Sequence, residues 1–82
     1  MQVLYFAWLR ERIGLASEEI DPGNAKTAGD LVTLLRDRSA SHALAFEDLS
    51  AVRIAVDQEM GNLDTPIAGA REVAFFPPVT GG

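Results

Sequence analysis

The sequence predicts an α+β fold in which one main helix crosses a mixed sheet. Three observations support this class. Strand-like segments open and close the chain, a single amphipathic helix pattern lies between them, and a length of 82 residues suits one domain. The expected order along the chain is strand, strand, helix, strand, short elements and strand.

The chain opens with an apolar segment at residues 3–9, which has the length and the residue types of a strand. Both its odd and its even positions are apolar, so the strand either lies inside the fold or presents one face to a partner. We expect Phe6 and Trp8 to share a face of it. The polar residues that follow end at Gly14 and indicate a turn, and residues 16–20 can form a second strand that closes a hairpin.

The main helix is expected from Ala28 to Arg38. Thr27 is a suitable N-cap, and Asp30 three residues later completes a short version of the capping box. Apolar residues then recur at the spacing of one helix face, namely Ala28, Leu31, Val32 and Leu35.

The second half of the chain contains two further strands. Residues 52–56 alternate between apolar and other side chains and predict one strand, and residues 71–76 predict the last, which two prolines terminate. Residues 60–62 indicate a turn. The apolar pattern of residues 39–50 does not distinguish a short helix from an ordered loop.

An opening hairpin that crosses by one helix into a mixed sheet is a β-grasp arrangement. A ferredoxin-like α+β fold is the alternative, but it needs a second full helix, for which residues 41–49 are a poor candidate. We therefore expect a β-grasp domain at residues 1–76 and a flexible tail at residues 77–82 that carries the C-terminal diglycine.

Composition excludes several classes of function. Seven basic and twelve acidic residues give a net charge of −5, which argues against nucleic acid and anionic membranes as partners. Cysteine is absent and His42 is the single histidine, so we expect no disulfide scaffold and no metal site, and we expect His42 in an exposed loop. No apolar run approaches the roughly 20 residues of a membrane span, and the start of the chain does not resemble a signal peptide. We expect a cytoplasmic domain.

The end of the chain suggests a specific chemistry. Glycine has no β-carbon, so Gly81 and Gly82 can thread a channel that is too narrow for side chains. Pro77 and Pro78 favour an extended start to the tail. The six residues of the tail would reach about 20 Å at about 3.3–3.6 Å per residue, which is far enough to enter the active site of a neighbouring protein.

Covalent chemistry at the C-terminus requires activation. The α-carboxylate, with a pKa of about 3.3–3.7, is ionised at neutral pH and is a poor electrophile. An acyl-adenylate made from ATP would activate it. The activated carbonyl can then accept sulfur to give a thiocarboxylate, or a lysine amine to give an isopeptide, and the residues alone leave both outcomes open.

Three segments carry a resemblance to a known family. They are LYFA followed by LRE and Gly14 near the start, RIAVDQE at residues 53–59, and LDTPI with EVAFFPPVTGG in the closing third. The Phe-Pro-Pro run before the diglycine is the most specific piece. In these segments the chain resembles the ubiquitin-like sulfur carriers, and among them the MoaD-type small subunits of molybdopterin synthase. It departs from the usual pattern at Asp57, where the family has asparagine, and at Ala70-Arg71, where the family has glycine and aspartate.

The resemblance implies a cycle of reactions. An E1-like enzyme would use ATP to adenylate Gly82, and a sulfur-transfer system would convert it to a thiocarboxylate. The carrier would then dock on the large catalytic subunit of molybdopterin synthase, within a heterotetramer, and donate sulfur to a pterin precursor to form the molybdopterin dithiolene. The large subunit would supply the catalytic side chains, so this chain would not be an enzyme on its own and would bind no cofactor.

The candidate site residues follow from the tail and from the predicted sheet. Gly82 would carry the adenylate and then the sulfur, and Gly81 would allow the tail to thread. We expect the sheet face opposite the helix to dock the large subunit together with the start of the tail. The candidate partner-binding residues are Phe6, Trp8, Phe75, Pro77, Pro78, Val79 and Thr80. For the three aromatic residues, packing in the core is the default interpretation.

Two other functions fit the same tail. One is a ubiquitin-like protein modifier, which would form isopeptides with lysines of other proteins. The other is a sulfur carrier for a different pathway such as thiamine biosynthesis, although thiamine carriers are generally shorter and do not have the Phe-Pro-Pro lead-in.

Overall fold

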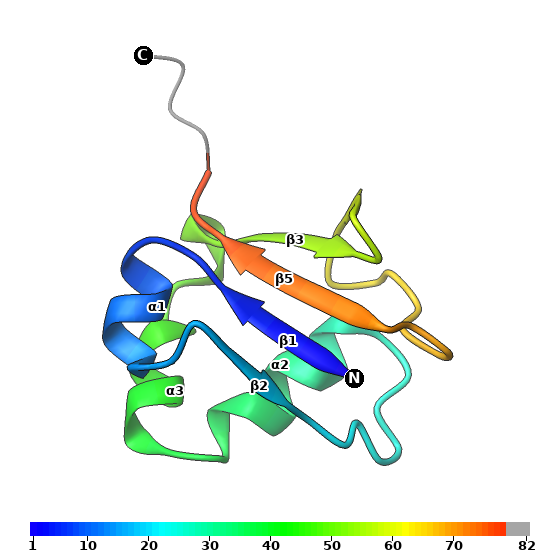
Figure 1. Cartoon of the computed structure of the whole chain (residues 1–82), viewed down its shortest axis with the longest axis horizontal. Helices are drawn as coiled ribbons and strands as arrows, with labels where there is room; N and C mark the ends of the chain where they lie inside the picture. Colours follow the sequence, from blue (N-terminus) through cyan, green and yellow to red (C-terminus); the bar gives the residue numbers. More distant parts are fainter. Residues whose placement is uncertain (79–82) are drawn as a thin grey trace.

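In the computed structural model, which describes residues 1–78, five strands form one mixed sheet in the order β2-β1-β5-β3-β4 (Figure 1). No helix in this part of the chain has the length and apolar character needed to cross a membrane. The elements are β1 (Gln2–Tyr5), α1 (Trp8–Ile13), β2 (Ser17–Glu19), α2 (Ala28–Arg36), α3 (Ala40–Ala45), the 3₁₀ helix η1 (Leu49–Ala51), β3 (Arg53–Val56), β4 (Glu59–Gly61) and β5 (Glu72–Phe76).

The pairing of the strands confirms the predicted β-grasp arrangement. β1 and β2 form the opening antiparallel hairpin, and β3 pairs antiparallel with both β4 and β5. β1 and β5 lie side by side in parallel, so the first and last strands end at the same edge of the sheet. The ladder continues past the strands, because the Phe6 amide donates to the Phe75 carbonyl at 3.1 Å.

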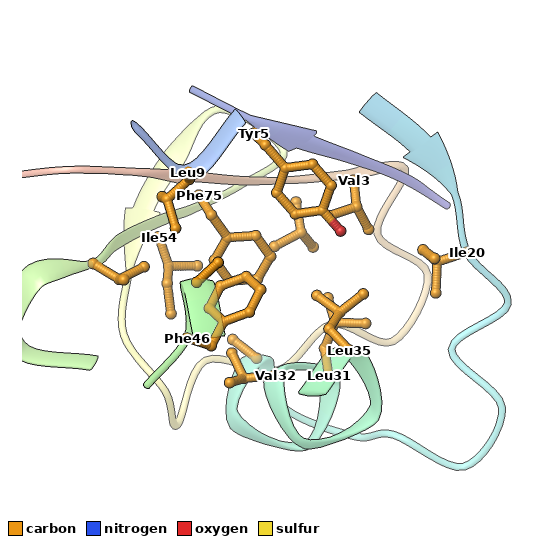
Figure 2. Packing of buried hydrophobic residues seen from close by; sticks show 14 of the residues in the cluster. Val3, Tyr5, Leu9, Ile20, Leu31, Val32, Leu35, Phe46, Ile54 and Phe75 are labelled. Carbon is orange, nitrogen blue, oxygen red and sulfur yellow. The ribbon is translucent and has the colours of Figure 1, made fainter. Parts of the chain in front are cut away.

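The core lies between the inner face of the sheet and α2, which passes behind β1 and β2 in Figure 1. Figure 2 shows aromatic rings from β1, from β5 and from the residue that follows α3 meeting there. The rings of Phe46 and Phe75 pack edge to face with centroids 4.9 Å apart, and Tyr5 stacks on Phe75 at 6.3 Å. All three side chains are buried, so they unite the central strands with the segment that follows α3.

The start of α2 is as predicted. The Thr27 hydroxyl accepts a hydrogen bond from the Asp30 amide at 3.2 Å, and the Asp30 carboxylate accepts from the amides of Lys26 and Thr27. These backbone bonds lower the pKa of Asp30. The helix ends at Arg36 rather than at the predicted Arg38, because the next two amides bond three residues back and tighten the last turn.

The first strand is shorter than predicted. It ends at Tyr5, and Ala7 has a φ of 54°, which turns the chain away from the sheet. Where a polar turn was expected, the chain forms α1. Leu9 and Ile13, one helical turn apart, are both buried, and Gly14 ends the helix with a φ of 87°. The prediction failed because a helix of six residues is too short to show a repeated apolar spacing.

The turn predicted at residues 60–62 is also misplaced. Residues Glu59–Gly61 form β4, and the hairpin turn consists of Asp57 and Gln58, which have φ values of 49° and 71°. Two left-handed residues suit the tight hairpin between β3 and β4. The carboxylate of Asp57 accepts hydrogen bonds from the amides of Arg71 and Glu72, so this side chain also fixes the start of β5.

Residues 39–50 contain α3, and the prediction of an exposed His42 is wrong. The His42 side chain is buried among polar partners. Its Nδ1 lies 2.7 Å from the Ser39 hydroxyl, and its Nε2 lies 2.6 Å from a carboxylate oxygen of Glu18. A residue on β2 therefore holds α3 against the edge of the sheet.

Glu18 is the centre of this buried polar group. The Tyr5 hydroxyl donates to the same carboxylate oxygen at 2.6 Å, and the Arg38 guanidinium lies 3.5 Å from the other oxygen. Burial of Glu18 by itself favours the neutral acid. The hydrogen bonds from Tyr5 and His42, with the nearby positive charge, outweigh it and lower the pKa of Glu18.

We predict that Glu18 makes stability sensitive to acid. Its pKa is lower in the folded chain than the roughly 4.3 of an unfolded glutamate. Its contribution is therefore present above that value and is lost as pH falls through the folded pKa. Glu18→Gln should lower the free energy of unfolding at neutral pH by on the order of 2 kcal/mol and should flatten the acid dependence. Urea unfolding followed by circular dichroism from neutral to acid pH measures both effects.

Glu47→Gln serves as the control, because Glu47 is exposed and its side chain makes no hydrogen bond or ion pair within residues 1–78. That variant should keep the wild-type acid dependence. A Glu18→Gln variant with the same acid dependence as the wild type would contradict the role assigned to Glu18.

Candidate functional site

The face of the sheet that points away from α2 forms a continuous surface, which we call the outer face. Side chains alternate along a strand, and Val3, Val73 and Ile54 are buried on the inner face. Residues directly opposite one another on paired strands share a face. The register therefore places one row across all five strands on the outer face, namely Ser17, Leu4, Ala74, Ala55 and Met60.

Apolar side chains dominate the centre and the tail end of the outer face. Leu4 and Phe76 are partly exposed, Phe6 is 45% exposed and Met60 is 68% exposed. The helices lie on the inner side of the sheet, so they do not cover these side chains. We call this surface the apolar patch, and define it as Leu4, Phe6, Ala55, Met60, Ala74 and Phe76.

Phe6 and Phe76 lie where the tail leaves the body. Phe6 follows the last residue of β1, and its amide bonds to the carbonyl of Phe75. Phe76 is the last residue of β5, and Pro77 and Pro78 follow it outside the sheet, both partly buried. The apolar patch is thus continuous with the start of the tail. Four predicted site residues, Val79, Thr80, Gly81 and Gly82, lie outside the described residues.

Two of the aromatic residues predicted as partner contacts lie elsewhere. Phe75 is fully buried against Phe46, so its default interpretation as a core residue is confirmed and its partner role is wrong. Trp8 belongs to α1 rather than to the first strand, and the guanidinium of Arg12 lies 4.8 Å from the centre of its ring. It therefore does not share a strand face with Phe6.

Phe76 is the residue that sequence reasoning missed. Residues 73–76 are all apolar, so the sequence does not show which of two adjacent phenylalanines faces the core. The register decides it, because Phe75 pairs with the buried Ile54 and Phe76 pairs with the exposed Arg53. Within residues 1–78, no three histidine, aspartate or glutamate side chains gather as a metal site would require.

Comparison with known families matches residues 3–82 to the ThiS family. This chain belongs to the ThiS family. Two relatives are both called molybdopterin synthase sulfur carrier subunit. The one from Escherichia coli (strain K12) is 39% identical, over 100% of this chain and 99% of the relative, and the one from Mycobacterium tuberculosis is 32% identical, over 100% and 96%. The resemblance to the sulfur carriers is thereby confirmed.

A solved structure supports the fold of this ThiS-family chain. The small archaeal modifier protein 1 of Haloferax volcanii matches with a TM-score of 0.75 and 26% identity, over 96% of this chain and 97% of that protein. The β-grasp arrangement inferred from the order of elements is therefore shared with a protein of known structure.

The two adjacent phenylalanines of this ThiS-family chain should respond differently to truncation. Phe75→Ala should lower the free energy of unfolding by about 3–5 kcal/mol, because it leaves a cavity in the core. Phe76→Ala, its matched control, should cost less than about 1 kcal/mol because that side chain is partly solvated. Denaturant unfolding followed by circular dichroism measures both values. Equal losses of unfolding free energy would show that Phe75 and Phe76 do not lie on opposite faces of β5.

Proposed function

We propose that this chain is the sulfur carrier subunit of molybdopterin synthase, and that it donates sulfur from a thiocarboxylate at Gly82 to a pterin precursor. The observation that carries the proposal is the full-length match to sulfur carrier subunits, which extends to the end of the chain. The fold adds support, because the central strand β5 ends at Phe76 and leads directly into the sequence PPVTGG.

The proposed chemistry begins with ATP on an E1-like activating enzyme. An oxygen of the Gly82 carboxylate attacks the α-phosphorus of ATP and displaces pyrophosphate, giving an acyl-adenylate. Hydrosulfide, or the outer sulfur of a persulfide, then attacks the carbonyl carbon and displaces AMP. Hydrosulfide gives the C-terminal thiocarboxylate directly, whereas a persulfide gives an acyl disulfide that a second thiol cleaves to the thiocarboxylate and a disulfide. Glycines at both final positions present no side chain to a narrow channel. The carrier itself binds no cofactor in this scheme.

The apolar patch is the proposed docking surface for the large catalytic subunit, within a heterotetramer in the cytoplasm. Exposed aromatic and methionine side chains such as Phe6, Phe76 and Met60 are enriched at the centres of protein interfaces. Phe6 and Phe76 lie beside Pro77, so a partner that covers the patch also receives the tail. Docking then directs Gly82 into the partner, whose side chains carry out catalysis, while this chain supplies the sulfur.

A second candidate function is protein modification. The structural similarity to an archaeal modifier protein favours it, and the same activated Gly82 could transfer to a lysine amine of another protein. The two functions share adenylation and differ in the nucleophile that displaces AMP. The products distinguish them, because a carrier gains sulfur and a modifier forms isopeptides.

We predict that activation depends on the position of Gly82. The test incubates the chain with ATP, the activating enzyme and a sulfur donor, and follows it by intact-mass spectrometry. The wild type should show the mass gain of sulfur replacing one oxygen, and should then support molybdopterin formation with the large subunit. Deletion of Gly82 shortens the reach by about 3.3–3.6 Å, and a misplacement of about 1 Å can cost on the order of 100-fold in rate.

Gly81→Leu should block the same reaction by steric bulk and should leave the thermal unfolding midpoint unchanged, because the position lies beyond the last strand. Leu44→Ala, a change at an exposed residue on α3, is the control and should react like the wild type. A chain without Gly82 that gains sulfur and supports product formation as well as the wild type would refute the proposal. Isopeptides on lysines without a thiocarboxylate would favour the modifier function.

A further inference from the structure

Positively and negatively charged residues of the outer face lie at opposite ends of the strands. Arg53 lies at the end from which the tail departs, where the register pairs it with Phe76. Glu19 and Glu72 lie at the opposite end, where both pair with Gln2. Glu19 also forms an ion pair with the amino group of Met1 at 3.1 Å. Among the outward-facing strand residues of the described chain, Arg53 is therefore the one cation, and it stands beside the tail.

Three of the six arginines make side-chain contacts within residues 1–78, and Arg10, Arg53 and Arg71 do not. Of these three, Arg53 is the one that belongs to a strand of the sheet. Arg36 donates to the carbonyl of Phe46, Arg38 pairs with Glu18, and Arg12 stacks on a tryptophan ring. The Arg53 side chain is exposed and makes no hydrogen bond or ion pair within residues 1–78. The fold therefore does not use this guanidinium, and all five of its donors remain available to a partner.

A partner that covers Arg53 must offer the guanidinium a matching group, or binding is weakened. On paired strands, β-carbons directly opposite one another lie about 4.5–5.5 Å apart, so a surface that buries Phe76 also removes water from Arg53. An unpaired guanidinium in such a place would weaken binding, because it loses its water without gaining a partner. The planar guanidinium is matched best by a carboxylate, which it can bind through two hydrogen bonds.

We infer that Arg53 sets the orientation in which the large subunit docks, by pairing with a carboxylate of that subunit beside the entrance for the tail. The inference rests on the proposed function. A partner turned end for end would bring its carboxylate against Glu72, and this repulsion disfavours the orientation in which the tail points away from the active site. Arg53 is thus a positioning residue and takes no part in the chemistry.

The test measures binding of the purified large subunit of molybdopterin synthase by calorimetry at low and at high salt. Arg53→Met keeps most of the apolar stem and removes the charge, and should weaken binding about 10-fold at low salt, whereas Arg53→Glu should weaken it about 10- to 100-fold. Both variants should reduce the salt dependence of the dissociation constant. Arg10→Glu, at an exposed position on α1, is the control with the same change in net charge and should bind within about 2-fold of the wild type.

The outcomes separate this inference from the proposed function. If Arg53→Glu binds like Arg10→Glu while Met60→Asp abolishes binding, the patch docks the large subunit but Arg53 does not orient it, and the inference is overturned. If the wild type itself does not bind the large subunit, the proposed function and this inference fail together. Circular dichroism of each variant confirms that its fold is retained.

Discussion

The parallel pairing of β1 with β5 is the constraint on which the rest of the molecule depends. It brings the beginning and the end of the described chain together in the centre of the sheet, with Tyr5 opposite Phe75. The last strand is held on both sides, by β1 as far as Phe75 and by β3 as far as its final residue, Phe76. The tail sequence therefore begins at a fixed point of the fold rather than at a frayed edge. A carrier whose reacting group is its own C-terminus needs such an anchor, because the reach of the tail is measured from there.

The same pairing gives the two faces of the sheet different roles. On the inner face, Tyr5 and Phe75 stack and pack against Phe46, while the Tyr5 hydroxyl reaches Glu18 and so links the core to the polar group around His42. On the outer face, the neighbouring residues Phe6 and Phe76 stay partly solvated beside the start of the tail. One pair of strands thus provides both the aromatic core and the surface that we propose for docking.

Local signals in the sequence predicted much of this fold, and long-range contacts explain what they missed. The capping box of α2 was predictable because Thr27 and Asp30 are three residues apart and bond to each other. The burial of His42 was not, because its partner Glu18 lies 24 residues away on another element. The outward position of Phe76 depends on the register with β3, to which a uniformly apolar strand gives no clue. The role of the diglycine stays a prediction, because Gly81 and Gly82 lie outside the described residues.

The central claim is that this chain carries sulfur at its own C-terminus in the cell. Purification of the untagged chain from its native host, followed by intact-mass spectrometry, tests it most directly. The account predicts a fraction of the chain heavier by the replacement of one oxygen with sulfur, which reverts to the unmodified mass after incubation with the large subunit and the pterin precursor. An unmodified carboxylate in every molecule, with the C-terminus recovered instead in isopeptides with lysines of other proteins, would contradict it.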